Sequence, residues 1–431
     1  MKEVVKIALA GFGTVGTGLV KILMENKDWI KRRTGKEIIV SQILVKNLNK
    51  PRPIIPQSEP IFTNNVDEFL QNKDWDILVE LIGGLELPYQ IISKAILFGK
   101  HVVTANKALL AIKGKELLQL ANAKNVGLYF EASVGGGIPI VQTLKESLCA
   151  NKVTSISGIL NGTANYILTE MSQQGLSFDL ALKQAQEKGY AEADPALDID
   201  GIDAAHKLVI LIFLAYGEIY PFEKLWIKGI KQVDLLDINF AKELGYILKL
   251  IAQVQRESNG LRAGVFPAFF PNNHILSKVD GAFNAILVQG NATGPVVLCG
   301  QGAGDLPTGS SVLADIISLI KHNSQINNTG FKDDPFQQAK CLDFMDWECK
   351  HYFRFQVKDK PGVLSSLSGV MGEYNISIAQ AIQKTQTKTK QGVPIVFLSH
   401  RAKLKQVTAA INKINEFDFI LEPTIHYPII E

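Results

Sequence analysis

The 431-residue sequence is poor in cysteine and lacks long hydrophobic runs. Its cysteines form no CxxC pair and none stands at metal-ligand spacing from a histidine; they are Cys149, Cys299, Cys341 and Cys349. Neither a disulfide framework nor a zinc site is therefore predicted. No segment holds eighteen uncharged apolar residues, and the N-terminal apolar stretch breaks at Gly11, which argues against a membrane span and a secretory leader. With reduced thiols as the default, these absences favour the cytoplasm.

An excess of charge of one sign is also missing. Lysine and arginine total 45 against 42 acidic residues, a net charge of +3, and charged residues are only 20% of the chain. No nucleic-acid-binding face and no membrane-surface anchor are predicted. The hydrophobic content of 46% is typical of a globular protein with a large core, and the length suggests roughly two to four domains.

Short β-branched runs alternate with helical periods in the first part of the chain. The strand-like runs are residues 4–10, 38–45, 77–82, 101–104 and 127–130, and clear helical spacing covers residues 87–98 and 107–123. This alternation predicts an α/β domain over residues 1–134, a doubly wound parallel sheet of the Rossmann type.

The rest of the chain divides by composition. Residues 135–322 have longer helical periods and later strand-like runs, which predicts an α+β substrate domain. Polar residues after His322 predict a linker over residues 323–349. Residues 350–431 follow the order strand, helix, strand, strand, helix, strand, which is a ferredoxin-like βαββαβ unit.

A glycine motif follows the first predicted strand directly and opens a helix: Gly11-Phe12-Gly13-Thr14-Val15-Gly16. Gly11 permits the tight turn, Gly13 lets a pyrophosphate approach the backbone, and Gly16 allows close helix packing. The helix N-terminus then offers free N–H groups to the phosphates. This context predicts dinucleotide binding; the alternative is a glycine turn without a ligand.

The second predicted strand ends at a lysine. An NAD-selective site usually carries Asp or Glu there to bind the ribose 2′-hydroxyl, but this chain has Lys46, with Lys50 and Arg52 beyond it. A cation fits a 2′-phosphate better, so NADP is the predicted cofactor and NAD the alternative. A solvated lysine without a ligand is the other interpretation.

The densest polar segment, residues 189–207, ends in an acid and a lysine four positions apart. If a helix starts near residue 200, Asp203 and Lys207 share one face. Reduction of a carbonyl needs a proton for the developing alkoxide, which Lys207 can supply, and Glu192 and Asp203 can hold a substrate ammonium. A helix-capping acidic loop with an i,i+4 ion pair explains the same pattern.

Three further segments contain candidate functional residues. Lys107 follows Thr104-Ala-Asn106 at the sheet edge where open α/β folds bind ligands, so it is predicted to face substrate and nicotinamide. Glu131 precedes a glycine-rich turn that either holds a hard cation or acts as a hinge. The segment at residues 161–166 either binds a small carboxylate at a helix start or is an ordinary N-cap.

Cys149 is the candidate nucleophile for a different chemistry, reduction of an acyl phosphate. It ends an apolar helical run with only Lys152 nearby, so we expect a buried structural thiol.

Residues 4–322 resemble homoserine dehydrogenase, which interconverts L-aspartate 4-semialdehyde and L-homoserine. The resemblance rests on the glycine motif and on the segments at residues 80–84, 104–111, 189–207 and 300–308. It implies that Lys207 is the acid/base residue and that Lys107 lies between nicotinamide and substrate. The implied homoserine contacts are Glu192, Asp203, Asp198, Tyr190, Gly162 and Thr163.

The same resemblance implies further contacts to the cofactor and a sodium ion. The implied cofactor contacts beyond the glycine motif and Lys46 are Ile82, Gly83, Thr104, Asn106, Lys107, Gly302 and Gly304. The sodium ion, expected to be structural, would be held by the Glu131 carboxylate and by carbonyls of Val134, Gly136 and Ile138. Lys46 replaces an arginine frequent in the family, which leaves the strength of the NADP preference open.

The segment from residue 350 resembles an ACT regulatory domain through residues 357–364 and 374–378. The resemblance implies amino-acid binding, with threonine as the expected inhibitor and Asp359, Gly362 and Asn375 as the candidate effector site. A domain used only for oligomerisation is the alternative. A homodimer or homotetramer is expected, and the start of the chain at its dinucleotide turn is interpreted as a monofunctional enzyme of threonine, methionine and isoleucine biosynthesis.

The sequence leaves two rival functions to compare with this one. An aspartate-semialdehyde dehydrogenase would need Cys149 as nucleophile and a histidine base, and no motif places His101 or His206 for that role. A non-catalytic amino-acid sensor with a vestigial dinucleotide domain would not need to keep both Lys107 and Lys207.

Overall fold

The computed structural model describes residues 3–322, 326–332, 336–383 and 392–431. The chain divides into two units: residues 1–162, 202–225 and 282–339 form the first, and residues 163–201, 226–281 and 340–431 the second. The predicted middle domain, 135–322, is thus shared between both units. Parts of the predicted linker, residues 323–325 and 333–335, lie outside the described residues.

The first unit contains a six-stranded parallel sheet in the order β3-β2-β1-β4-β5-β6. Its strands are β1 (Val4–Ala10), β2 (Glu37–Leu44), β3 (Ile61–Thr63), β4 (Ile77–Glu80), β5 (His101–Thr104) and β6 (Leu128–Tyr129). The order reverses between β1 and β4, which is the switch point where doubly wound folds bind ligands. The predicted Rossmann-type sheet is confirmed.

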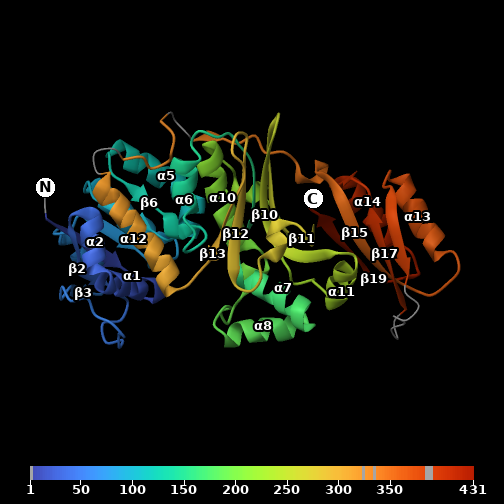
Figure 1. Ribbon diagram of the computed structural model, residues 1–431, viewed down its shortest axis with the longest axis horizontal. Coiled ribbons are helices and arrows are strands. Elements are labelled where there is room, and N and C mark those ends of the chain that lie inside the picture. The colour runs from blue at the N-terminus through green and yellow to red at the C-terminus, as the bar shows by residue number, and fades with distance from the viewer. Residues whose placement is uncertain (1–2, 323–325, 333–335, 384–391) are drawn as a thin grey trace. The chain divides into compact units, whose positions relative to one another are not determined.

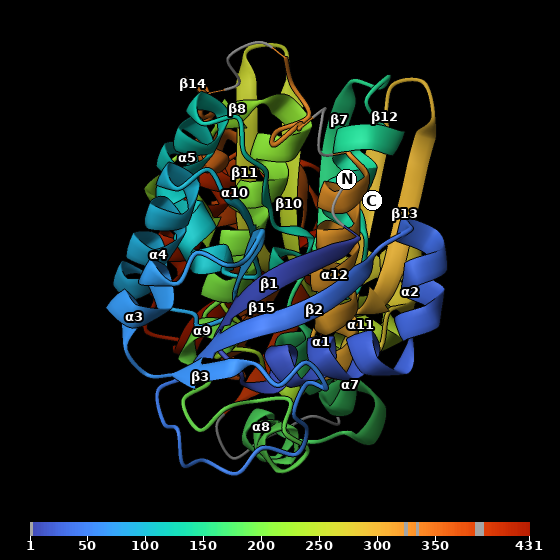
Figure 2. The same cartoon turned by 90° about the vertical axis from the view of Figure 1, so that its left-hand side faces the viewer.

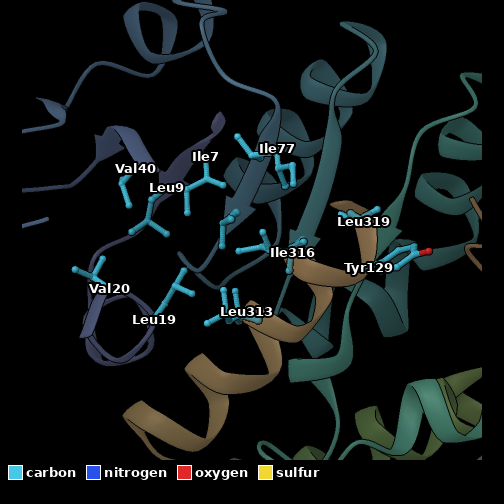
Figure 3. Close-up of a cluster of buried hydrophobic side chains, with 14 of the residues drawn as sticks. Ile7, Leu9, Leu19, Val20, Val40, Ile77, Tyr129, Leu313, Ile316 and Leu319 are labelled. Atoms are coloured by element: carbon cyan, nitrogen blue, oxygen red, sulfur yellow. The ribbon is translucent and has the colours of Figure 1, made fainter. Parts of the chain in front are cut away.

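Helices cover this sheet, and one of them comes from far along the chain. They are α1 (Thr14–Glu25), α2 (Lys27–Thr34), α3 (Val66–Gln71), α4 (Glu86–Leu97), α5 (Lys107–Ala123) and α12 (Asp305–Lys321). Helix α12, which was not predicted, lies beside α1 (Figure 2). Leu313 and Ile316 of α12 join Leu9 and Leu19 in one buried core (Figure 3).

The first unit also holds an antiparallel ribbon of β7 (Val153–Ile159), β12 (Phe283–Gly290) and β13 (Gly294–Gln301), in the order β13-β12-β7. Its longest remaining helix is α10 (Ile202–Tyr216). A short α6 (Ile140–Gln142) continues into a π-helical turn at Thr143–Ser147, and β8 (Glu218–Ile219) pairs with β14 (Gln337–Gln338).

The second unit is built on a sheet in the order β10-β11-β19-β15-β17-β16. Strands β10 (Tyr246–Glu257) and β11 (Gly260–Pro271) form a long antiparallel hairpin, of which only the first strand was predicted. The same part of the chain forms α7 (Gly162–Gln174), α8 (Phe178–Glu187), α9 (Ala196–Ile199), β9 (Trp226–Ile227) and α11 (Leu235–Glu243). Figure 1 labels α7, α8 and α11.

The C-terminal segment of this unit has the predicted βαββαβ order. Its elements are β15 (Glu348–Val357), α13 (Val363–Glu373), β16 (Ile378–Gln383), β17 (Val393–Ser399), α14 (Leu404–Ile414) and β19 (Ile420–Ile429), with the short β18 (Ala402–Lys403) before α14. Phe353, Phe355 and Phe397 of the sheet form a core with Leu367 of α13 and Val407 of α14. The ferredoxin-like prediction is confirmed.

Among the described residues, no helix is both long and apolar enough to cross a bilayer.

Candidate active site

One carboxylate and two lysines meet in the first unit. Asp203 and Lys207 stand one turn apart on α10, and Lys207 Nζ donates to Asp203 Oδ2 at 2.7 Å and to the Leu160 carbonyl at 2.6 Å. Lys107, the first residue of α5 after β5, places Nζ 3.0 Å from Asp203 Oδ1. Asp203 and Lys207 are buried, whereas 39% of the Lys107 side chain is exposed. The sequence predicted the Asp203–Lys207 pair but not the direct contact with Lys107.

The two lysines fix the charge of Asp203. Burial by itself raises the pKa of this carboxyl, but the ammonium groups of Lys207 and Lys107 outweigh burial and hold the pKa well below its ordinary value. Asp203 therefore stays ionised at neutral pH, orients Lys207 and neutralises part of its charge.

Two asparagines that sequence reasoning assigned no role complete this cluster. Asn161 Nδ2 donates to Asp203 Oδ2 at 2.8 Å, and Asn284 Nδ2 donates at 3.1 Å to the same Leu160 carbonyl that accepts from Lys207. Asn161 lies in the segment predicted to bind a carboxylate, but no feature of the neighbouring sequence predicted that its side chain contacts Asp203. The one feature that could have identified Asn284 is that a polar residue occupies a buried position of strand β12.

The glycine motif has the geometry that a dinucleotide requires. Gly11 has φ +100°, and a Cβ there would lie 2.6 Å from the Leu81 carbonyl oxygen, so no other residue fits. A Cβ at Gly13 would meet nothing within 4 Å, which leaves the turn open to a ligand. Phe12, Thr14 and Val15 complete the turn and the first turn of α1.

The carboxyl ends of β4 and β5 bring several predicted cofactor residues together. Glu80 accepts from the N–H groups of Ile82 and Gly83 at 2.8 and 3.1 Å and from the Thr104 hydroxyl at 2.6 Å. Asn106 donates to the Gly84 carbonyl at 2.8 Å and caps α5 by accepting from Leu109 N–H. Glu80, which was not predicted as a site residue, therefore fixes the turn after β4 and links it to the end of β5.

Of the remaining predicted cofactor residues, Lys46 and Gly304 are exposed and Gly302 is half-buried. Lys46 follows β2 and is exposed, whereas Arg52 is held by the carbonyls of Asn47, Leu48 and Lys50. Gly302 and Gly304 form the turn between β13 and α12, where Gly304 has φ +132° and precedes the helix.

Glu131 is a buried acid with little compensating charge. Its two carboxylate oxygens accept from the N–H groups of Val141 and Gln142, each at 2.8 Å. Burial raises the pKa of Glu131 to about 7, and burial raises the pKa of the neighbouring Asp315 well above its ordinary value. Lys145 is the cation that acts on both acids, and burial lowers its pKa.

The residues around Glu131 supply oxygen acceptors, which are the type of ligand that hard cations take. Each carboxylate oxygen uses one acceptor position on a backbone N–H and keeps another. Gly135 and Gly136 adopt left-handed φ angles of +74° and +57°, and the Gly136 carbonyl accepts one hydrogen bond from Ser311. Val134 and Ile138 complete the predicted oxygen set, and both are buried.

Most of the predicted substrate residues belong to the second unit. The Thr163 hydroxyl donates to the Tyr190 carbonyl at 2.5 Å, and the Tyr190 ring lies 4.9 Å from that of Tyr166. Glu192 is exposed and Asp198 half-buried. Gly162 is the first residue of α7 and the last residue of the 1–162 segment of the first unit.

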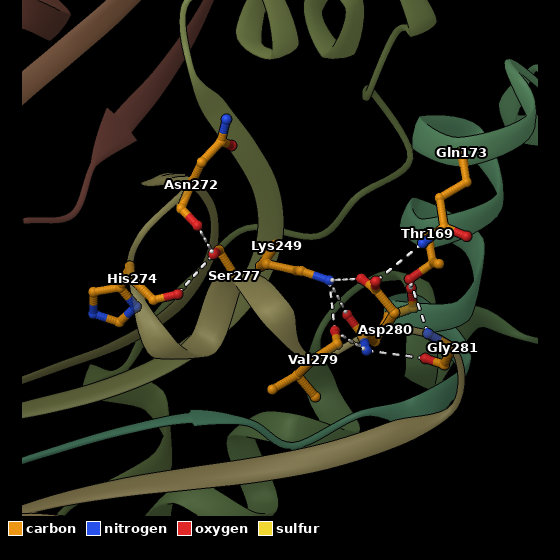
Figure 4. Close-up of polar contacts among 10 residues, drawn as sticks. Thr169, Gln173, Lys249, Asn272, His274, Ser277, Val279, Asp280 and Gly281 are labelled. Carbon is orange, nitrogen blue, oxygen red and sulfur yellow. Dashed lines mark hydrogen bonds and ion pairs between the residues drawn. The ribbon is translucent and has the colours of Figure 1, made fainter.

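A buried polar network holds the start of α7. Lys249 of β10 donates to the Val279 carbonyl at 2.6 Å and to Asp280 at 3.1 Å (Figure 4). It also donates to Asn165 Oδ1 at 3.3 Å. Asn165 in turn donates to the carbonyls of Val279 and Gly281, each at 2.9 Å. The segment that contains Thr163 is thereby tied to the sheet.

The candidate effector residues lie at opposite ends of α13. Asp359 is exposed in the loop before the helix, Gly362 is its N-cap with φ +88°, and Asn375 lies two residues past its end with φ +57°. Because an eleven-residue helix is about 16 Å long, one chain does not bring these residues into a single site.

The expectation for Cys149 was wrong. Its thiol side chain is exposed, since the apolar helical run before it ends in a π-helical turn and leaves Cys149 on the surface.

Comparison with known proteins identifies the family of this chain. Three family models match: "Homoserine dehydrogenase, NAD binding domain" over residues 11–131, "Homoserine dehydrogenase" over 139–317 and "ACT domain" over 351–416. The homoserine dehydrogenase of Neisseria gonorrhoeae is 40% identical over 427 residues, 97% of each chain, and that of Pseudomonas aeruginosa 37% identical over 426 residues, 98% of each.

Solved structures agree as well. A homoserine dehydrogenase from Thiobacillus denitrificans superposes with a TM-score of 0.93 at 39% identity, covering 99% of this chain and 98% of that one. A hyperthermophilic archaeal homoserine dehydrogenase in complex with NADPH has a TM-score of 0.62 at 29% identity, covering 76% of this chain and 99% of that one. The matches span nearly the whole sequence, so the chain belongs to the homoserine dehydrogenase family and carries an ACT domain.

Proposed function

We propose that the protein interconverts L-aspartate 4-semialdehyde and L-homoserine with NADP, as a step of threonine, methionine and isoleucine biosynthesis. The observation that carries this proposal is the Lys107–Asp203–Lys207 cluster at the end of a dinucleotide-binding sheet. A buried lysine held by a carboxylate and a carbonyl is the proton donor that carbonyl reduction needs.

The chemistry divides between the cofactor and the protein. The bound nicotinamide supplies the hydride for reduction and accepts it for oxidation. Lys207 transfers one proton from Nζ to the oxygen of the reduced carbonyl, so that hydride and proton together give the alcohol. Asp203 orients Lys207 and receives part of the substrate ammonium charge together with Glu192 and Asp198. Lys107, more exposed, stabilises the developing alkoxide from the nicotinamide side.

Substrate recognition is proposed for the start of α7 and the loop before α9. Gly162 and Thr163 offer a helix start to the carboxylate of homoserine, and Tyr190 closes the contact through its hydrogen bond with Thr163.

The test is an absorbance assay at a wavelength where reduced nicotinamide absorbs, with L-homoserine and either NADP or NAD. Reduction of the cofactor that requires homoserine supports the proposal. A folded protein that reduces neither cofactor would instead support the amino-acid sensor.

The preference for NADP is proposed to depend on Lys46. Replacing Lys46 by alanine should raise KM for NADP by up to about fivefold, because an exposed ion pair contributes about 1 kcal/mol or less. KM for NAD, which lacks the 2′-phosphate, should not change. Lys31→Ala, a change at an exposed lysine of α2, is the matched control. Equal changes in KM for both cofactors would remove Lys46 from 2′-phosphate recognition.

A structural sodium ion is proposed at Glu131, and it should alter the pH dependence of stability. Without a cation the folded protein keeps a proton on Glu131 up to about pH 7, whereas the unfolded chain loses it near pH 4.5. The free energy of unfolding should therefore fall by roughly 3 kcal/mol between these pH values. Sodium favours the ionised carboxylate and should remove most of this loss.

The measurement is Tm at pH 5 and pH 8 in sodium chloride and in choline chloride of equal ionic strength. We expect the two salts to differ at pH 8 for the wild type and to agree for Glu131→Gln. Glu187→Gln, at an exposed position of α8, should behave as the wild type. Equal Tm values in both salts at pH 8 would rule out a sodium ion held by Glu131.

Regulation is proposed through the ACT domain. Threonine is the proposed inhibitor, bound with help from Asp359, Gly362 and Asn375. Because Asn375 and the other two residues lie at opposite ends of α13, the proposed site joins residues of two chains, in a homodimer or homotetramer. The cytoplasm is the proposed location.

A further inference from the structure

The buried side chain of Asn284 uses only its donor group. Its Nδ2 donates to the Leu160 carbonyl at 3.1 Å, and the residue is 1% exposed. A carbonyl can only accept, so Nδ2 rather than Oδ1 must face it. Among the described residues, none donates a hydrogen bond to the buried Oδ1. A buried acceptor without a partner costs free energy, because it has lost water without a replacement.

Neighbouring backbone fixes the position of this amide. Strand β12 pairs with β7 on one side and with β13 on the other, which brings Asn284 beside the end of β7. A Cβ at Gly302 would lie 2.2 Å from both Cγ and Nδ2 of Asn284, so the backbone of the turn after β13 packs directly against the amide. The amide is therefore held between the Leu160 carbonyl and this turn, and the unpaired Oδ1 is the cost of holding it there.

The Leu160 carbonyl receives two donors of different kinds. Lys207 Nζ donates to it at 2.6 Å, and Asn284 adds a neutral amide donor. A carbonyl oxygen that accepts from an ammonium group stabilises the protonated form of the lysine. The amide occupies the other lone pair of the same oxygen and draws on the same electron density, so it weakens this stabilisation. Asn284 thus favours the neutral form of Lys207.

We propose that Asn284 is a positioning residue that sets the protonation of Lys207 through the Leu160 carbonyl. This inference rests on the proposed function, in which neutral Lys207 accepts the proton of homoserine. The amide acts on the carbonyl and not on the substrate. Because the turn that contains Gly302 packs against the amide, the same contact joins the proton-transfer group to a segment expected to meet the cofactor.

The other charges around Lys207 act on it independently of Asn284. Asp203 accepts from Lys207 Nζ at 2.7 Å and stays ionised. Lys107 pairs with the other oxygen of Asp203 and adds a second positive charge to the cluster. Burial lowers the pKa of His206, so this ring is neutral over the alkaline range. A change at position 284 therefore tests the carbonyl contact while these three groups remain.

The test compares Asn284→Leu and Asn284→Ala with the wild type in the pH profile of homoserine oxidation. Leucine keeps the size of the side chain and alanine does not, but both lack the donor. Each should move the midpoint of the alkaline rise to higher pH and lower the rate below that midpoint by about twofold to fivefold, the order of one hydrogen bond between neutral groups. At the alkaline plateau the loss of rate should disappear.

Thermal stability separates this role from a structural one. The Leu160 carbonyl keeps Lys207 as a donor in both variants, and leucine removes the unpaired Oδ1, so we expect Asn284→Leu to retain its Tm. Alanine leaves a cavity and should lower Tm. Asn291→Leu, at the exposed turn of the same hairpin, is the matched control and should keep the wild-type midpoint. Midpoints that do not move, or that move in proportion to the loss of Tm, would overturn the proposal.

NMR of isotope-labelled lysine side chains separates this proposal from the proposed reaction. The signal of Lys207, assigned by its absence in Lys207→Met, reports protonation without any substrate. Its titration midpoint should be higher in Asn284→Leu than in the wild type, and an equal midpoint would exclude the role of Asn284. An inactive wild type would contradict the proposed reaction, whereas the NMR comparison would still decide whether Asn284 controls Lys207.

Discussion

Replacing Lys207 by methionine should lower kcat in both directions by about 10²- to 10⁴-fold, the usual contribution of a positioned acid or base. Methionine keeps the apolar length of the side chain on α10 but has no proton to transfer. KM for homoserine should change much less, because Asp203 remains ionised beside Lys107 and can still hold the substrate ammonium. The measurement is steady-state kinetics in both directions with the cofactor at saturation.

Loss of activity must be separated from loss of fold. Lys207→Met removes one partner of a buried carboxylate, but Asp203 keeps Lys107 and Asn161, so Tm should fall only moderately. Lys115→Met, on the exposed face of α5, is the matched control and should retain full activity. Near-normal turnover of folded Lys207→Met would show that another group transfers the proton.

The pH profile gives an independent check of the same role. Oxidation of homoserine requires neutral Lys207 to accept the proton, so its rate should rise toward alkaline pH in the wild type. In Lys207→Met, the rate of homoserine oxidation should no longer rise toward alkaline pH. A profile that is unchanged by the substitution would assign the rise to a different group.

The sequence predicted well those features that local pattern controls. Strand β5 and helix α5 begin and end where the periodicity placed them, because each is bounded by a turn or cap within a few residues. The Asp203–Lys207 pair follows from helix geometry alone, since residues four apart share a face.

Features that depend on distant parts of the chain could not be predicted in the same way. The contact of Lys107 with Asp203 joins residues 96 positions apart, and Asn284 reaches the Leu160 carbonyl from another strand. Helix α12 has apolar residues at helical spacing, but only the fold shows that it packs with α1 in the first unit. For the same reason the two units are each assembled from three separate segments.

The packing of α12 against α1 leads to a prediction with a large effect on stability. Gly18 of α1 lies where a Cβ would come 2.1 Å from the Asp305 carbonyl oxygen and 2.4 Å from its carbonyl carbon. These are backbone atoms at the first turn of α12, so they cannot move aside as a flexible side chain could. Gly18→Ala should therefore force the two helices apart and destabilise the protein by about 1–3 kcal/mol, despite the better helix propensity of alanine.

The same change should weaken cofactor binding, because α1 begins at the dinucleotide turn and α12 begins directly after Gly304, its N-cap. Tm by calorimetry and the Kd of NADP by fluorescence titration measure the two effects. Gly114→Ala is the matched control: it lies within α5 of the same unit, where a Cβ would make ordinary contact with Leu110 at 3.8 Å, and it should leave Tm unchanged or raise it. If Gly18→Ala is as stable as Gly114→Ala, then α1 and α12 are not in the close contact that buries the core between them.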